Sequence, residues 1–271
     1  MEPKKSSIKI SVVMGIYNCA VTLPEAIESI LAQTISDWEL ILCDDGSEDE
    51  TLEVARKFAD RYPEKIVLIR NERNQGLNFT LNRCLDCARG EYIARMDGDD
   101  RCSPERFELQ LKAFEEHPDI SIISTAMEHF DEKGVWGMIR HPEYVQKQDF
   151  LYGTPFCHAP CMVKKEAFEC VGGYSQAKHL LRVEDYHLWI KMYAAGYKGM
   201  NLAQPLYQMR DDRNAYRRRK FRYRLNEAYV KCFAVQQLKL PVKGYLYALR
   251  PIIVGLLPAG IYTYLHKRKL R

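Results

Sequence analysis

Apolar and polar positions in the first hundred residues alternate between two periods. Apolar runs at 8–14, 38–43, 65–70 and 91–96 predict strands, and a helical period follows the first three, at 22–33, 51–62 and 77–88. Strands and helices that alternate with short connections indicate a parallel sheet with right-handed crossovers. In the first helix, Thr22 is expected to be the N-cap, with Glu25 completing a capping box.

The second half of the chain predicts a less regular arrangement. We expect a helix from about 103, strands at 120–126, 159–163 and 197–202, a hairpin over 128–139, and helices at 165–170 and 183–194. After Pro205 the chain becomes basic, in one predicted helical stretch with Arg210, Arg213, Arg217, Arg218, Arg219, Lys220, Arg222 and Arg224. An apolar and aromatic stretch follows at 252–265. This tail either packs on the domain or lies at an anionic membrane surface, and the sequence leaves both open.

Polar residues follow three of the predicted parallel strands. They are Tyr17-Asn18, Asp44-Asp45 and Asp97-Gly98-Asp99-Asp100. The carboxyl ends of parallel strands meet at one edge of a sheet, so these clusters are expected to converge there. Three carboxylates within four residues repel one another, and a divalent cation such as Mg²⁺ or Mn²⁺ relieves that repulsion. The alternative is a solvated acidic turn that precedes the next helix.

Composition narrows the class of protein. A net charge of +4 over 271 residues is small, so the whole molecule is not a polyelectrolyte binder. Nine scattered cysteines favour a reducing compartment, and Cys84, Cys87, Cys157 and Cys161 are expected to be buried thiols because no zinc-ligand spacing surrounds them. Residues 1–9 lack a signal-peptide core, and no apolar run is long enough to span a bilayer. The expected location is cytoplasmic, with a peripheral position at the inner face of the plasma membrane left open.

Eight stretches together resemble family 2 glycosyltransferases of the bacterial cell-surface polysaccharide type. They are 12–18, 29–34, 37–47, 71–76, 88–92, 94–100, 172–174 and 184–186, in the family's order and spacing over about 8–207. Gly15 departs from the family, in which many members have proline there. The resemblance implies an α/β GT-A fold: a Rossmann-like, mostly parallel central sheet flanked by helices. We expect a domain at 1–210, with a nucleotide-sugar half (1–100) and an acceptor half (101–210), and a helical basic extension at 211–271.

The resemblance also implies a metal-dependent, inverting glycosyltransferase of the hexosyltransferase type. It would move a sugar from a nucleoside diphosphate sugar, with UDP as the nucleotide, to a hydroxyl of a glycan or lipid-linked saccharide. Tyr17 would stack on the nucleobase, Asp45 would accept its N–H, and Asp185 would be the general base beside Glu184. The implied donor nucleotide site comprises Gly15, Tyr17, Asn18, Asp44, Asp45, Arg73, Asn74, Asp97 and Gly98. Asp97 and Asp99 would hold Mn²⁺ or Mg²⁺, and the acceptor side would comprise His158, Tyr174 and Trp189.

Each assignment has an alternative. Tyr17 is otherwise a core aromatic, Asp45 an N-cap for the helix that begins near Asp49, Asp185 a first-turn carboxylate and His158 a structural histidine. A sugar-nucleotide pyrophosphorylase would need a basic, glycine-rich loop after the first strand, and a Rossmann dehydrogenase a G-x-G-x-x-G there; the chain has neither. A non-enzymatic binder of nucleic acid or anionic membrane would leave the carboxylate clusters without a role, and no nucleic acid partner is expected.

Overall fold

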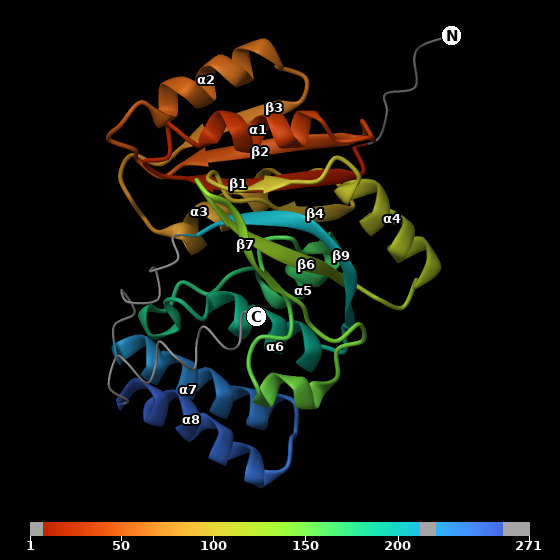
Figure 1. The fold of residues 1–271 in the computed structure, drawn as a ribbon, viewed down its shortest axis with the longest axis vertical. Coiled ribbons are helices and arrows are strands. Elements are labelled where there is room, and N and C mark those ends of the chain that lie inside the picture. Colours follow the sequence, from red (N-terminus) through yellow and green to blue (C-terminus); the bar gives the residue numbers. More distant parts are fainter. Residues whose placement is uncertain (1–7, 212–220, 257–271) are drawn as a thin grey trace.

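A computed structural model describes residues 8–211 and 221–256 of this chain. Its sheet has the order β3-β2-β1-β4-β8-β6-β9-β5, and β7 pairs with β6 outside that path (Figure 1). The strands are β1 (Ile10–Ile16), β2 (Trp38–Asp44), β3 (Ile66–Arg70), β4 (Tyr92–Arg95), β5 (Arg101–Cys102), β6 (Ile122–Asp131), β7 (Gly134–Ile139), β8 (Met162–Lys164) and β9 (Gly199–Arg210). The α-helices are α1 (Leu23–Leu31), α2 (Thr51–Arg61), α3 (Leu77–Cys87), α4 (Arg106–Glu116), α5 (Lys165–Val171), α6 (Glu184–Ala194), α7 (Phe221–Gln237) and α8 (Tyr245–Leu256).

The first half is the parallel arrangement that the sequence predicts. β1 pairs in parallel with β2 and β4, and β2 pairs in parallel with β3. Val12 and Met14 point into the core shared with α1 and α2, whereas Val13 points into the core shared with α3 and α6. Side chains alternate across a strand, so a continuous apolar run fits a strand that is buried on both faces.

In the second half of the sheet, the last strand is longer than predicted and the strands run in both directions. β8 lies antiparallel between β4 and β6, and β9 runs parallel to β6 as far as Arg210. The prediction that this last strand ends at 202 is therefore wrong. Pro205 lies opposite Ala126 at a register shift, where a strand tolerates the missing N–H of proline. The short strand β5, which the sequence did not predict, pairs with the end of β9.

The predicted capping box at the start of α1 does not form. Thr22 is the N-cap residue, but its side chain makes no capping hydrogen bond. Its hydroxyl donates instead to the backbone oxygen of Gly98, at 3.0 Å, and Glu25 pairs with Arg101 and Arg210. Long-range partners take both groups, so the start of α1 is tied to the loop after β4 through Gly98, to β5 through Arg101 and to β9 through Arg210.

Three of the four cysteines expected to be buried are buried. Cys84, Cys157 and Cys161 lie in the core, whereas Cys87 is exposed in the last turn of α3. The prediction for Cys87 is wrong because Cys87 lies about 60° round the helix from Cys84 and is the last residue of α3, where the helix leaves the core. All nine cysteines are free thiols.

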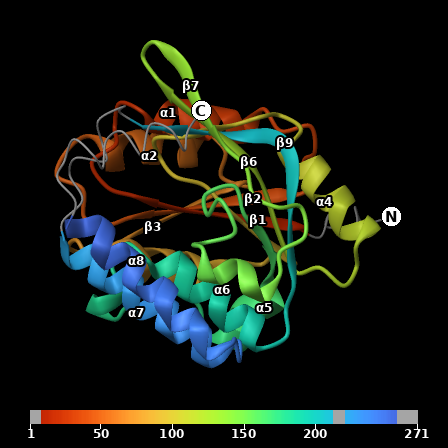
Figure 2. The ribbon, with the colours of Figure 1, turned by 60° about the horizontal axis from the view of Figure 1, so that its bottom comes forward.

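The chain ends, as far as it is described, in a hairpin of two helices. α7 packs on the side of the molecule that carries α6, and α8 lies against α7 (Figures 1 and 2). The buried Lys231 of α7 donates a 2.7 Å hydrogen bond to the backbone oxygen of Leu151. Within the described ranges, no helix is long and apolar enough to cross a membrane. Most of the predicted basic stretch (213–220) and of the apolar stretch beyond 256 lies outside the described residues.

Candidate active site

The loops at the carboxyl ends of the parallel strands converge as predicted. The backbone N–H of Asn18, after β1, donates to the hydroxyl of Ser47, after β2, at 3.1 Å. The side-chain oxygen of Asn18 accepts from the backbone N–H of Glu48 at 2.9 Å. Asn18 has a φ of 48°, a conformation that asparagine tolerates better than most residues. The hydrogen bond between Thr22 and Gly98 joins the same region to the loop after β4.

Asp45 organises the loop after β3. Its carboxylate accepts three hydrogen bonds: from the side chain of Asn71 (2.7 Å), and from the backbone N–H groups of Gln75 (2.9 Å) and Gly76 (2.8 Å). The predicted alternative for Asp45, an N-cap for the helix near Asp49, is wrong, because Asp45 binds the segment just before α3. Its predicted role as acceptor for the nucleobase stays a prediction, and the three donors already present compete with it.

The other nucleotide-site residues fall into exposed and buried groups. Tyr17 is 44% exposed, so the alternative that it is a core aromatic is wrong. Arg73 and Asn74 are also exposed, and their backbone lies against Gly46. Asp44 is fully buried, and its carboxylate accepts from the backbone N–H of Ser47.

Neighbouring side chains leave little room for any side chain at Gly15 and Gly98. A Cβ on Gly15 would lie 3.1 Å from the side chain of Thr80 in α3, and one on Gly98 would lie 3.0 Å from the sulfur of Cys19. The implied place of Gly15 in the donor nucleotide site stays a prediction.

The acidic loop after β4 holds two accessible carboxylates. Asp97 is partly exposed, and its carboxylate lies 2.7 Å from Arg95 in an ion pair. Asp99 is exposed, yet desolvation by the surrounding protein, and then the charge of Asp97, raise its pKa above the ordinary value. Asp100 is buried, and its pKa lies well above the ordinary value because of burial and then because of Asp97 and Asp99.

The pair Asp97 and Asp99 fits a divalent cation. The negative charge of Asp97 raises the pKa of Asp99, so the two carboxylates repel each other, and a cation bound to both would remove that repulsion. No group of three or more His, Cys, Asp or Glu side chains with metal-binding geometry occurs in the described part of the chain. Proteins often bind Mg²⁺ and Mn²⁺ through only one or two carboxylates, and substrate phosphates and water supply the remaining ligands. Two carboxylates are therefore enough for such a site.

Tyr207 and Arg210, at the end of β9, hold this loop, and neither was predicted from the sequence to belong to the site. The hydroxyl of Tyr207 bonds to Asp100, and the Nε of Arg210 donates to the backbone oxygen of Asp99 at 3.0 Å. Arg210 also pairs with Glu25 of α1. A tyrosine and an arginine spaced three residues apart near the end of a strand were the available signal, but local sequence does not say which loop they meet.

Asp185 and Glu184 occupy the first turn of α6. Burial, followed by the charge of Glu184, raises the pKa of Asp185 to about 6. The positive charge of Arg95 acts in the opposite direction and lowers the pKa of Asp185. One oxygen of Glu184 has no hydrogen-bond partner among the described residues. The charge of Arg95 therefore acts both on Asp97, through the ion pair, and on the predicted base, Asp185.

The predicted acceptor-side aromatics are buried. Trp189 is fully buried and Tyr174 nearly so, and both rings meet the ring of His158 edge to face, at centroid distances of 5.4 and 5.8 Å. Neither ring offers a free face to a sugar, so that expectation is wrong for these two residues. Burial, followed by the charge of Arg95, lowers the pKa of His158 well below its ordinary value. His158 is therefore neutral, and it lies close enough to Arg95 for that charge to act on its pKa.

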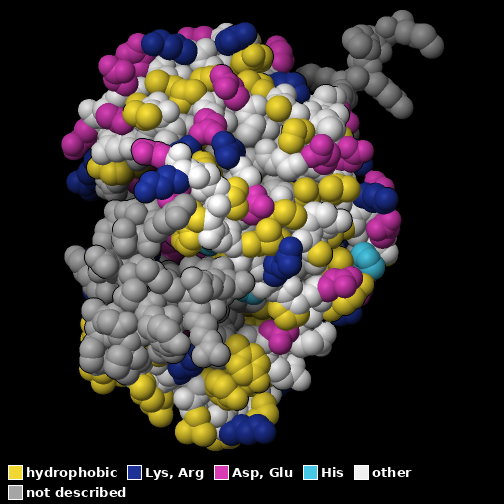
Figure 3. Space-filling view, viewed as in Figure 1, with side chains coloured by type: hydrophobic (Ala, Val, Ile, Leu, Met, Phe, Trp, Pro, Cys, Tyr) yellow, Lys and Arg dark blue, Asp and Glu magenta, His cyan; other side chains and the backbone are white. Residues whose placement is uncertain are grey.

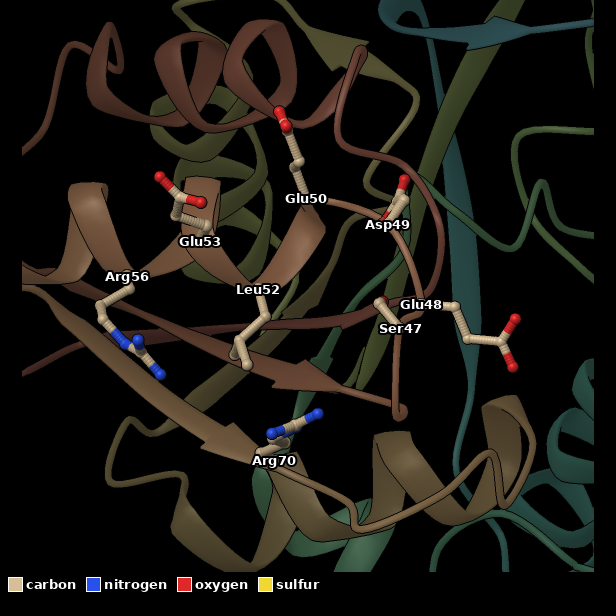
Figure 4. Close-up of a pocket in the computed structure, with 8 residues that line it drawn as sticks. All are labelled: Ser47, Glu48, Asp49, Glu50, Leu52, Glu53, Arg56 and Arg70. Carbon is tan, nitrogen blue, oxygen red and sulfur yellow. The ribbon is translucent and has the colours of Figure 1, made fainter.

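A surface pocket lies beside the converging loops, at the start of α2. Its volume is about 540 Å³, and it is lined by Ser47, Glu48, Asp49, Glu50, Leu52, Glu53, Arg56 and Arg70. Arg56 and Arg70 extend along one side of it, and Glu48 points away from them (Figure 4). None of the predicted site residues lines this pocket, so the candidate site is the neighbouring loop cluster.

Comparisons with known proteins agree with this architecture. The family model described as "Glycosyl transferase family 2" matches residues 11–172. EpsE of Bacillus subtilis, named as a glycosyltransferase, is 42% identical over 98% of this chain and 95% of its own. The Escherichia coli UDP-Gal:alpha-D-GlcNAc-diphosphoundecaprenol beta-1,3-galactosyltransferase is 30% identical over 97% of each chain. The structure of the mannosyltransferase PcManGT of Pyrobaculum calidifontis with GDP-Man and Mn²⁺ superposes with a TM-score of 0.68 at 19% identity, over 96% of this chain and 79% of its own. The predicted GT-A fold is confirmed.

Proposed function

This chain belongs to glycosyl transferase family 2 and is a glycosyltransferase, and on that premise we propose that it inverts the anomeric centre of a UDP-linked sugar in a metal-dependent transfer. The sugar would pass to a hydroxyl of a saccharide, and a lipid-linked saccharide is the proposed acceptor. The relative that acts on a diphosphoundecaprenol-linked GlcNAc supports the choice of UDP and of a lipid-linked acceptor.

The observation that carries the proposal is the position of Arg95. Its guanidinium is buried and paired with Asp97, and its charge also acts on Asp185. Burial disfavours the charge of Arg95, but Asp97, together with Tyr174, Tyr207 and Asp185, outweighs burial and raises the pKa of Arg95 above the ordinary value. A permanently charged side chain thus acts on a carboxylate of the loop after β4 and on the carboxylate at the start of α6.

The proposed mechanism assigns one task to each group. Tyr17 offers an exposed ring to the nucleobase, and Asp97 and Asp99 would hold the cation. When bound, a divalent cation neutralises charge that develops on the leaving diphosphate. Asp185 accepts the proton of the acceptor hydroxyl while that oxygen forms a bond to the anomeric carbon, and the diphosphate leaves with the electron pair of the bond that breaks. Attack from the face opposite the leaving group inverts the anomeric centre.

The pKa of Asp185 suits this task. A base with a pKa of about 6 is mostly deprotonated at neutral pH, yet it retains more proton affinity than an ordinary aspartate. Glu184 is proposed to position the acceptor or the base. His158 is proposed to support Arg95 from behind as a neutral side chain rather than to contact the sugar.

The experiment is a calorimetric titration of the full chain with UDP, in Mn²⁺ and then in EDTA. We expect binding that requires the metal and that Asp99→Ala abolishes. GDP is titrated in parallel, because one structural neighbour holds GDP-Man. Tight binding of GDP in place of UDP would overturn the choice of nucleotide, and UDP binding that is equal in EDTA would overturn the metal. Glu72→Ala, at an exposed position in the loop after β3, is the control for loss of an acidic residue.

A further inference from the structure

The charges of this chain are divided unevenly along its length. Residues 213–271 contain 15 of the 40 Lys and Arg residues but only one of the 36 Asp and Glu residues, Glu227. The segment therefore carries a net charge of +14, and the remainder of the chain carries −10. A strong asymmetry between two parts of one chain indicates that the basic part meets an anionic surface.

Exposed apolar side chains gather on one face of α8. Tyr245, Leu246, Leu249, Ile253 and Leu256 are all exposed, and Leu246 and Ile253 keep 69% and 59% of their surface in solvent. At 100° for each residue, the five positions fall within an arc of about 100° on the helix. Val242, just before α8, is 80% exposed and extends this apolar face.

Basic side chains border the apolar face. Lys239, Lys243 and Arg250 are exposed, and α8 contains no acidic residue. The opposite side of α8 is packed: Ala248 and Pro251 are buried, and Gly255 lies against the side chains of Phe221 and Arg224 in α7. Hydrophobic and basic side chains share the end of the molecule that holds α7 and α8, at the bottom of Figure 3. The apolar face is thus held outward by a packed helix pair.

We propose that this face of α8, with Val242 and the basic residues Lys239, Lys243 and Arg250, docks on an anionic lipid bilayer. Aliphatic side chains and a tyrosine would enter the interfacial region while the lysines and the arginine meet the headgroups. Nucleic acid explains the basic residues but not the leucines and the isoleucine. A second copy of this chain would bring two basic rims together, at a cost in repulsion. The peripheral membrane position considered from the sequence thereby gains a defined surface.

The helix that carries the docking surface packs on α7, and α7 contacts the segment that leads to the proposed base. In α7, Asn226 donates a 2.9 Å hydrogen bond to the backbone oxygen of Leu181, and Tyr229 meets the ring of His179 edge to face. Leu181 lies four residues before Asp185, so the helix pair touches the segment that leads to the proposed base. Docking through α8 would bring the segment before α6, and with it Asp185, close to a lipid-linked acceptor. This last step depends on the proposed function, whereas the docking itself does not.

The test is cosedimentation of the full chain with phosphatidylcholine vesicles that contain or lack phosphatidylglycerol. We expect binding only to the anionic vesicles, and we expect salt to weaken it. Leu246→Glu combined with Ile253→Glu should reduce the partition coefficient at least about tenfold, because two charges would have to enter the interface. Lys243→Gln combined with Arg250→Gln should weaken binding and its salt dependence. Val135→Glu, at an exposed position on β7, is the control and should bind as the unchanged chain does.

Four results would overturn the proposal. One is equal binding to anionic and neutral vesicles, and another is unchanged binding by both double variants. A third is a dimer in light scattering that the Leu246 and Ile253 double variant converts to a monomer without a change in vesicle binding. The fourth is binding of a DNA duplex that is lost with the basic residues while vesicle binding persists. The UDP titration uses no vesicles, so failure of docking and failure of the proposed function are separate outcomes.

Discussion

The phenolic hydroxyl of Tyr207 donates a 2.8 Å hydrogen bond to Oδ2 of Asp100. The same oxygen of Tyr207 accepts a 3.2 Å hydrogen bond from the backbone N–H of Asp97. The other carboxylate oxygen of Asp100 accepts from the backbone N–H of Arg210, at 2.8 Å. Asp100 thus fastens the acidic loop to the end of β9, while Asp97 stays partly exposed and Asp99 exposed.

Tyr207→Phe should loosen this loop. The change removes one hydrogen bond from a buried carboxylate and one from a backbone N–H, and we expect the free energy of unfolding to fall by about 1–3 kcal/mol. Metal-dependent UDP binding should weaken as well, because Asp97 and Asp99 lose their fixed spacing. Urea unfolding and calorimetry measure the two effects. Tyr197→Phe, whose hydroxyl is at the surface, should change stability by less than about 0.5 kcal/mol. Unchanged UDP binding by Tyr207→Phe would contradict the link between β9 and the loop.

Asp45→Asn should disturb the loop before α3. An amide has one acceptor oxygen, and its NH₂ group would face the donors of Asn71, Gln75 or Gly76 that the carboxylate now binds. We expect a loss of about 1–3 kcal/mol in the free energy of unfolding, and faster amide exchange at Gln75 and Gly76. Asp86→Asn, on the exposed face of α3, is the control. If Asp45→Asn leaves exchange and stability unchanged but lowers UDP affinity, Asp45 acts on the nucleobase and not on the loop.

Asp185→Asn should separate binding from transfer. The amide keeps the size of the side chain but cannot take a proton from the acceptor hydroxyl, so we expect UDP affinity within about twofold of the unchanged chain and a transfer rate about 10²–10⁴-fold lower. Donor binding is measured by calorimetry, and transfer by release of UDP in the presence of an acceptor. A variant that retains the full transfer rate would show that Asp185 is only a first-turn carboxylate of α6.

The parallel half of the fold could be predicted because its information is local. Val12, Val13 and Met14 form a run that only a strand buried on both faces accommodates, and the helical periods around it fix the crossovers. The convergence of Asn18, Asp45 and Asp97 then follows from the geometry of parallel strands.

The missed parts depend on contacts between distant segments. Tyr207 reaches Asp100 across a separation of 107 residues, and β9 could be extended past Pro205 only because its register with β6 shifts there. Thr22 has the sequence context of a capping box, yet a closer acceptor on Gly98 takes its hydroxyl. Trp189 resembles a sugar-binding aromatic until the burial of its whole surface is known.

Glu184→Gln tests the electrostatic origin of the pKa of Asp185. Burial and the negative charge of Glu184 both raise that pKa, to about 6, so transfer should decline as the pH falls through about 6. Removal of the Glu184 charge takes away one of these two causes. The acidic limb of the pH–rate profile should therefore move to lower pH, with less loss of activity at acidic pH. Glu166→Gln, on an exposed position of α5, should leave the limb where it is. An acidic limb that stays in place in Glu184→Gln, with transfer otherwise intact, would mean that a group other than Asp185 controls the pH dependence.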